Sequence, residues 1–155
     1  MLLGFKYRRI GSFLIDLAIV RMFAQLGIQV YFGIVTYLGK GAGVSLSLSD
    51  NITLPVLLLL SVMVLLLFIG VYVGYHWLCY RLLGNSLSRY FLHIKVVSGN
   101  DKPLTQSRYL KREFEKVLLC VATVGMYMFY SGAQFVAFGY QPYHDKRNHT
   151  KVVDA

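Results

Sequence analysis

The chain contains three long apolar stretches separated by polar segments. The first runs from about Gly11 to Leu38 and the second from about Pro55 to Tyr80. About 20 helical residues cover the roughly 30 Å hydrocarbon core of a bilayer, so both stretches are predicted to be transmembrane helices. The third stretch, Val117 to Phe138, is also long enough to span, but Gly125 and the small residues 131–133 offer places to bend. The pattern predicts an all-α integral membrane protein with two firm spans and a third apolar helical segment, spanning or re-entrant.

The polar segments differ sharply in charge. The segment from Arg81 to Lys116 holds eight Lys or Arg, whereas the glycine- and serine-rich loop that begins at Gly39 holds only Lys40 before Thr53. Basic residues favour the cytoplasmic side of a membrane, so the larger loop is predicted to be cytoplasmic. Basic residues between positions 6 and 9 place the N-terminus on the same side, as two spans require.

A small β element is predicted outside the membrane. Residues 91–97 are partly β-branched and precede the turn-forming residues 98–101, which is typical of a strand entering a turn. The sequence of residues 93–97, HIKVV, is echoed by HTKVV at residues 149–153. Two such strands pair only if the tail lies on the cytoplasmic side, which favours a re-entrant or broken hairpin for the third stretch. A single span would instead place the C-terminus outside.

Composition supports the membrane assignment. Of the 155 residues, 56% are hydrophobic, and the mean hydropathy is +0.54. The net charge of +9 would suit nucleic acid, but most basic residues flank apolar stretches, where they set topology. Cys79 and Cys120 lack metal or disulfide spacing. The first stretch contains Asp16 and Arg21 and no small-residue cleavage site, so it is expected to be a retained helix. We expect a lipid environment and no nucleic-acid partner.

Asp16 is an acid inside the first apolar stretch. On a helix it shares one face with Arg9 and Ser12, with the two charges about 10 Å apart along the axis. An ionised acid in hydrocarbon costs at least roughly 2.5 kcal/mol, so an acid at this depth needs a partner. It is either a carboxylate that takes up a proton or cation, or half of an internal ion pair with Arg9, Arg112 or Lys116.

A second polar face is predicted on the same helix. Arg21, Gln25 and Gln29 lie at i, i+4 and i+8, and Asp16 lies about 140° away around the helix axis. This stripe either lines a pore or binds a partner, or it supplies hydrogen bonds between helices of a bundle or homo-oligomer.

Other polar residues give weaker signals. His144, Asp145 and His149 lack a metal-binding frame, and hydrogen bonds from the tail to the basic loop are the preferred interpretation, with no metal expected. Glu113 and Glu115 are expected to lie on a solvated helix start with local pairing. No nucleophile with an orienting base and no phosphate-binding loop is evident, so neither enzyme activity nor a cofactor is expected.

Four motifs occur in order along nearly the whole chain. They are Arg9-Ile-Gly-Ser-Phe-Leu-Ile-Asp16, Gly84-Asn-Ser-Leu-Ser-Arg89, Ile94-Lys-Val-Val97 and the tail from Tyr143 to Val153. In these motifs the chain resembles the RDD family of membrane proteins. That family is named for an arginine at the start of the first transmembrane helix, an aspartate within it and a further aspartate. The matching residues here are Arg9, Asp16 and Asp145.

The resemblance adds candidate residues in the loop and the tail. Those of the loop are Gly84, Ser86, Arg89 and Arg112, and those of the tail are His144 and Thr150. The family's usual loop resembles Gly-x-Thr-x-Gly-Lys, whereas this chain has Ser88 at the second glycine, which questions a role that depends on close backbone approach.

The resemblance implies one membrane domain over residues 1–155, in a bacterial inner membrane with a cytoplasmic N-terminus. The leading functional hypothesis is exchange of a small cation for protons at Asp16, with Arg9 setting its pKa and Asp145 as a second carboxylate. A homo-oligomer would then be needed, because two or three helices shield a polar route poorly from lipid. The alternative is a non-transporting subunit that binds another membrane protein through the Arg21, Gln25, Gln29 stripe.

Overall fold

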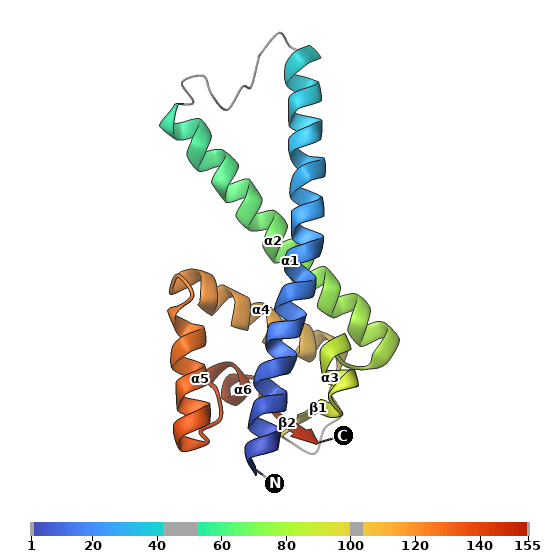
Figure 1. Ribbon diagram of the computed structural model, residues 1–155, viewed down its shortest axis with the longest axis vertical. Helices are drawn as coiled ribbons and strands as arrows, with labels where there is room; N and C mark the ends of the chain where they lie inside the picture. The colour runs from blue at the N-terminus through green and yellow to red at the C-terminus, as the bar shows by residue number, and fades with distance from the viewer. Residues whose placement is uncertain (1, 42–52, 100–103, 155) are drawn as a thin grey trace. The chain divides into compact units, whose positions relative to one another are not determined.

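The computed structural model describes residues 2–41, 53–99 and 104–154 (Figure 1). These residues form two compact units. The first unit comprises Met1–Ala18 and Val73–Ala155, and the second comprises Ile19–Tyr72. Each unit is described in turn.

Two long helices run through the second unit. They are α1 (Leu2–Gly41, 40 residues) and α2 (Leu54–Leu83, 30 residues), whose remaining turns belong to the first unit. Both are long and apolar enough to cross a membrane, which confirms the two predicted helices. They pack closely at Gly27, where an added Cβ would lie 3.2 Å from Leu67 Cδ2.

Helix α1 begins nine residues before the predicted start at Gly11, because the basic first turns are helical although they are not apolar. The hydropathy pattern marks the apolar part of a helix and not its ends. Of the predicted loop from Gly39 onward, residues 39–41 belong to α1, and the rest lies outside the described residues.

Four short helices and two strands complete the first unit. In chain order they are α3 (Leu87–Phe91), β1 (Ile94–Ser98), α4 (Gln106–Ala122), α5 (Met126–Phe138), α6 (Tyr143–Arg147) and β2 (Thr150–Asp154). The two strands pair antiparallel, with Val96 opposite Val152, which confirms the pairing predicted from the HIKVV and HTKVV echo. The predicted turn residues 100 and 101 lie outside the described part of the chain.

The strand pair anchors a small core. Ile94, Val96, Tyr109 and Val152 are buried together, and the ring of Tyr80 stacks on Tyr109 with centroids 4.6 Å apart. The echo extends to the backbone, since the residue before each strand, a histidine, has a positive φ of 51° or 49°. Helix α4 is thus joined to the sheet through Tyr109.

The third apolar stretch is broken. Helices α4 and α5 meet at a bend of 116°, where Val124 and Gly125 have φ of 50° and 84°. The predicted bend at Gly125 is therefore confirmed, whereas residues 131–133 stay helical within α5. The helix that carries the first part of this stretch, α4, begins at Gln106, before the apolar residues from Val117, because its first turns are polar and hydropathy alone does not reveal them. The bent pair is either a broken span or a re-entrant segment.

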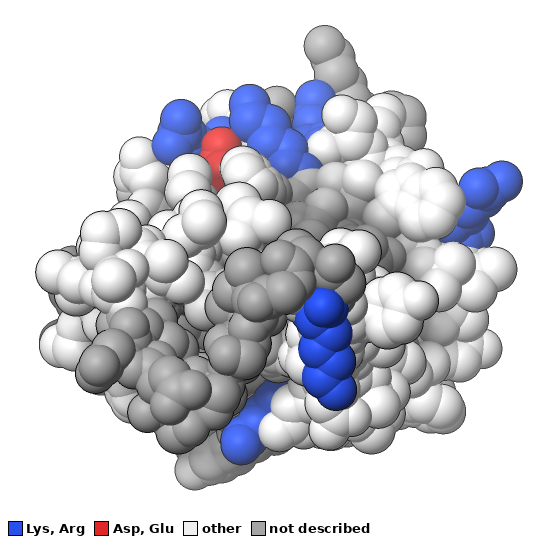
Figure 2. Space-filling model, turned by 90° about the horizontal axis from the view of Figure 1, so that it is seen from above, with Lys and Arg blue, Asp and Glu red and all other residues white. Residues whose placement is uncertain are grey.

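Large apolar side chains are widely exposed. They include Leu58 and Leu66 on α2 and Phe129 and Tyr130 on α5. In the face drawn in Figure 2, most of the described surface is uncharged. Exposure of this extent in water would be unfavourable, so lipid is the suitable surrounding for these helices.

Candidate functional site

The carboxyl group of Asp16 is buried and only half satisfied. Asp16 is 2% exposed, and its Oδ1 accepts a hydrogen bond of 2.7 Å from the Tyr75 hydroxyl. Its Oδ2 has no hydrogen-bond partner among the described residues. A buried carboxylate oxygen without a donor carries a desolvation penalty of about 1–3 kcal/mol or more.

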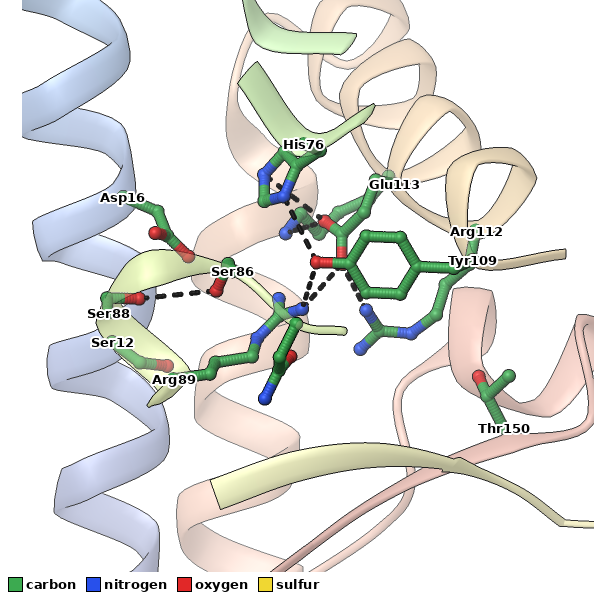
Figure 3. A network of polar contacts seen from close by, with 12 residues as sticks. Ser12, Asp16, His76, Ser86, Ser88, Arg89, Tyr109, Arg112, Glu113 and Thr150 are labelled. Carbon is green, nitrogen blue, oxygen red and sulfur yellow. Dashed lines mark hydrogen bonds and ion pairs between the residues drawn. The ribbon is translucent and has the colours of Figure 1, made fainter. Parts of the chain in front are cut away.

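Neutral hydroxyl groups lie on the side that Asp16 faces. In Figure 3 its carboxylate points toward α3, where Ser86 and Ser88 lie, and Ser12 precedes it by one turn on α1. All three serines are buried. The Ser12 hydroxyl donates to the carbonyl oxygen of Arg9 at 2.8 Å, and the Oγ atoms of Ser86 and Ser88 lie 3.4 Å apart. The hydroxyl groups on this side of Asp16 are neutral.

The ion pair that was one of the two alternatives for Asp16 is not formed among the described residues. Arg9 and Arg112 both bind Asp145, the latter through Nε at 2.6 Å from Oδ1. Lys116 Nζ lies 2.6 Å from Glu113 Oε2. The three predicted partners are thus engaged by other acids, and no ion pair involves Asp16 within the part of the chain that the structure describes. Sequence spacing identified the shared helix face but not the acids of α4 and α6 that compete for the cations.

Glu113 is the centre of a buried charge cluster. Its side chain is fully buried and pairs with Arg112, with Lys116 and with Arg89, whose Nη1 lies 2.9 Å from Oε1. The prediction that Glu113 and Glu115 lie on a solvated helix start is wrong, because both are buried. The predicted local pairing is confirmed for Glu113. The buried residues of α4 are Tyr109, Arg112, Glu113, Glu115, Lys116 and Val117. Several lie three or four positions apart, and this spacing was the signal that could have placed Glu113 on an inward face.

His76 and Tyr109 extend this cluster. His76 Nδ1 lies 3.2 Å from the Tyr109 hydroxyl, which also accepts a hydrogen bond of 3.1 Å from Arg89 Nη1. His76 Nε2 lies 3.8 Å from Glu113 Oε2, and Figure 3 shows the imidazole above the Tyr109 hydroxyl and Glu113. Neither residue was predicted, because no motif found in the sequence includes His76 or Tyr109.

Asp145 joins the tail to α1 and α4. Burial alone would raise the pKa of its carboxyl, but Arg112, His144 and Arg9 outweigh burial and hold the pKa below its usual value. The Thr150 hydroxyl lies 3.4 Å from the same oxygen that Arg112 contacts. The tail candidates His144 and Thr150 are therefore beside Asp145, as an anchoring role requires.

His144 is held neutral in this anchor. Its Nδ1 lies 2.6 Å from the Tyr127 hydroxyl. Burial, together with the neighbouring charge of Arg112, lowers the pKa of the imidazole to about 3. A second link is formed by Asn148, whose Nδ2 donates to Glu115 Oε2 at 2.6 Å. These contacts stabilise the docking of the tail against α4.

The loop motif divides into two roles. Gly84 has a φ of 69°, and its N–H bonds to the carbonyl of Tyr80 at 2.9 Å, which ends α2. Ser86 faces Asp16, whereas Arg89 joins Arg112 at Glu113. The motif thus connects the end of α2 with both polar groups of the first unit.

The polar stripe of α1 belongs to the second unit. Arg21, Gln25 and Gln29 are all exposed in this chain, whereas Val20 and Ala24 are buried. Across the described ranges, no group of three or more His, Cys, Asp or Glu side chains is placed to hold a metal ion.

Comparison with known proteins gives one match. Searches of curated proteins and of solved structures found no similar protein. The model of the RDD family matches residues 5–151, nearly the whole chain. The matched residues include Arg9, Asp16 and Asp145. Of these, Arg9 and Asp145 form an ion pair in the fold. The chain therefore belongs to the RDD family.

Proposed function

We propose that this membrane protein exchanges a small cation for protons, and that Asp16 is the carboxylate that takes up either one. The proposal rests on one observation: the Oδ2 atom of Asp16 is buried and has no hydrogen bond or ion pair among the described residues. A buried ionised carboxylate without a counter-charge costs several kcal/mol. A bound proton or a bound cation neutralises the carboxylate and removes this cost, so protons and cations compete for the same oxygen of Asp16.

Arg9 and Asp145 have a different role in this proposal. Their ion pair is shared with Arg112 and fastens the first turns of α1 to α4 and the tail. These residues hold the polar unit in which Asp16 lies and do not themselves bind the transported ion. Arg9 is not the counter-charge of Asp16 in this proposal, because its guanidinium binds Asp145.

The contacts of the first unit support one arrangement in the membrane. The β1–β2 pair joins the basic loop to the tail, and Arg8 Nη2 lies 2.6 Å from Asp154 Oδ1, which brings the N-terminal turns to the same place. Paired strands lie on one side of a bilayer. With the basic loop in the cytoplasm of a bacterial cell, α1 and α2 cross the inner membrane and α4–α5 returns to the side from which it started.

A homo-oligomer is part of the proposal. Two crossing helices leave most of their side chains to the surroundings, and a polar route at their surface would meet lipid. A second copy would shield that route. The exposed polar stripe Arg21, Gln25 and Gln29 offers hydrogen-bonding groups for such contacts.

The test is ion-driven proton movement in proteoliposomes. Purified wild-type protein is reconstituted with a pH-sensitive dye inside, and sodium, potassium or lithium chloride is added outside. Asp16→Asn keeps the shape of the side chain and removes its titration. The matched control is Asp154→Asn, the same chemical change at an exposed acid.

The expected result is cation-dependent proton movement by wild type and Asp154→Asn, and its loss in Asp16→Asn that elutes like wild type in size-exclusion chromatography. Exchange by Asp16→Asn at the wild-type rate would remove Asp16 from the mechanism. Absence of movement by wild type with all three cations would refute autonomous exchange of these ions.

A second candidate function is favoured by the exposed stripe itself. A charged and two amide side chains on a membrane-spanning helix are unfavourable in lipid, and another membrane protein would satisfy them. The chain would then be an accessory subunit that assists or inhibits that partner. Purification in mild detergent would recover a stoichiometric heterologous protein, which Gln25→Leu plus Gln29→Leu loses and the exposed control Ser61→Leu retains. Recovery of a homo-oligomer alone would count against this function.

A further inference from the structure

We propose that the hydroxyls of Ser86 and Ser88 complete, with Asp16 Oδ2, a binding site for a dehydrated sodium ion and determine its preference over potassium. The inference rests on the proposed function of Asp16 and names the ion and the additional ligands. Its basis is the Asp16 Oδ2 atom without a partner among the described residues, the weak contact between the buried Ser86 and Ser88, and the charges of the first unit.

Ser86 occupies a position where serine normally has a structural task. It is the N-cap residue of α3, with φ −73° and ψ 156°, yet its side chain makes no capping hydrogen bond. An N-cap serine usually accepts a bond from the amide two or three residues later. Because Ser86 is fully buried, no exposure to solvent replaces that bond. Its oxygen is therefore available to a ligand.

Ser88 is in the same situation. It is 1% exposed, and its hydroxyl contacts that of Ser86 at an Oγ–Oγ distance of 3.4 Å. Hydroxyl–hydroxyl bonds are usually about 2.5–3.0 Å long, so this contact is weak. Two buried hydroxyls joined by one long contact keep lone pairs on their oxygens that a cation can use.

The third oxygen is Asp16 Oδ2. The Tyr75 hydroxyl fixes the other carboxylate oxygen at 2.7 Å, so a single oxygen of Asp16 remains to bind a cation. Figure 3 shows the carboxylate directed to the side on which Ser86 and Ser88 lie, with their hydroxyls turned toward each other. One carboxylate and two neutral hydroxyls form a set of hard oxygen ligands, the kind that alkali and alkaline-earth cations prefer.

The charge of the site favours a monovalent cation. Asp16 supplies one negative charge, and the next buried acid, Glu113, is already paired with Arg89, Arg112 and Lys116. Ca²⁺ sites commonly use several carboxylates. A divalent ion would leave one positive charge that the Asp16 carboxylate does not compensate, whereas a monovalent ion is neutralised.

The spacing of the two serines favours sodium among the monovalent cations. Two oxygens on an octahedral edge 3.4 Å long lie about 2.4 Å from the metal, within the range of about 2.3–2.6 Å for Ca²⁺, an ion of nearly the radius of Na⁺. The smaller Li⁺ would require the serines to approach each other, and the larger K⁺ would require them to separate. Because both serines are buried, either movement disturbs their packing.

The test measures binding without requiring transport. Dicyclohexylcarbodiimide modifies protonated carboxyl groups in apolar surroundings, and intact-mass spectrometry counts the modified protein. Purified protein in detergent is treated in choline chloride with increasing NaCl, LiCl or KCl at constant ionic strength, and Asp16→Asn identifies the labelled residue. The quantity compared is the salt concentration that halves the labelling of Asp16.

Four variants accompany wild type. Ser86→Ala and Ser88→Ala remove one hydroxyl each, and Ser86→Thr keeps the hydroxyl. Ser61→Ala is the matched control, because Ser61 is exposed and its hydroxyl donates to its own helix at Leu57. Equal labelling of all variants in choline chloride verifies that Asp16 has kept its surroundings.

We expect NaCl to protect wild type at a concentration at least tenfold lower than KCl. Each alanine variant should raise the half-protecting NaCl concentration about tenfold, which corresponds to about 1.4 kcal/mol for one lost ligand. Ser86→Thr and Ser61→Ala should match wild type. Unchanged sodium protection in both alanine variants, or no protection of wild type by sodium, would overturn the inference.

The outcomes separate this inference from the proposed function. Sodium protection that depends on the serines, without proton movement in proteoliposomes, would establish the binding site and refute exchange. Exchange through Asp16 with wild-type sodium dependence in both alanine variants would support the proposed function and refute the role of the serines.

Discussion

Replacement of Glu113 by glutamine should be among the most destabilising single changes in the first unit. The Glu113 carboxylate is fully buried and pairs with Arg89 at 2.9 Å, with Lys116 at 2.6 Å and with Arg112. Glutamine has nearly the same shape but no charge, so Arg89 and Lys116 would lose their shared carboxylate. Arg112 would keep Asp145 at 2.6 Å. Breaking one buried pair costs about 3–5 kcal/mol, and the loss of two here places the expected cost at the upper end, about 5 kcal/mol.

The comparison is with an exposed ion pair in the same unit. Arg8 and Asp154 also approach to 2.6 Å, but their side chains are 40% and 60% exposed. Such pairs contribute about 0.2–1 kcal/mol, so Asp154→Asn should cost no more than that. The contrast isolates burial, because both substitutions replace a carboxylate by the corresponding amide at a similar distance from a cation.

The assay is equilibrium unfolding in mixed micelles with an increasing fraction of sodium dodecyl sulfate, followed by circular dichroism. The free energy of unfolding of each variant is compared with that of wild type. If Glu113→Gln is recovered only in aggregates, Glu113→Asp, which keeps the charge, should restore folded protein. A Glu113→Gln protein within about 1 kcal/mol of Asp154→Asn would refute the reasoning that burial makes this cluster costly to break.

Two further predictions concern pH and the backbone. The pKa of His144 is about 3 in the folded protein and about 6.5 in the unfolded chain. Between these values the unfolded chain binds a proton at His144 that the folded protein does not bind. The free energy of unfolding of wild type should therefore fall as the pH drops from about 6.5 toward 3, by up to about 1.4 kcal/mol per pH unit. His144→Gln should reduce this slope in a pH titration of stability, and an unchanged slope would contradict it. The lowered pKa of Asp145 gives stability that is present above its unfolded pKa and lost at still lower pH. Gly84→Ala should cost about 1–2 kcal/mol in the same unfolding assay, because Gly84 has a φ of 69°. The cost comes from the backbone alone, since an added Cβ would meet nothing within 4 Å. A neutral effect would show that α2 does not depend on this cap.

The sequence by itself determined the membrane class, the two long helices, the break at Gly125 and the pairing of residues 94–98 with 150–154. The physical reason is that these features depend on local properties. Apolar length measures how much of a helix lipid can cover, glycine permits a positive φ, and a repeated β-branched segment carries its own pairing pattern. Each is readable without knowledge of what lies opposite in space.

The tertiary structure alone decided which charges pair. Arg9 lies two helical turns from Asp16 in sequence and 136 positions from Asp145, yet it binds Asp145. Glu113 lies in a polar segment and is fully buried. An ion pair is decided by competition among all charges within a few ångströms, and burial increases the difference between the right partner and the wrong one. Spacing along α1 gave the shared face of Arg9 and Asp16, but only the docking of α4 and α6 assigned the cations to other acids and left Asp16 Oδ2 without a partner among the described residues.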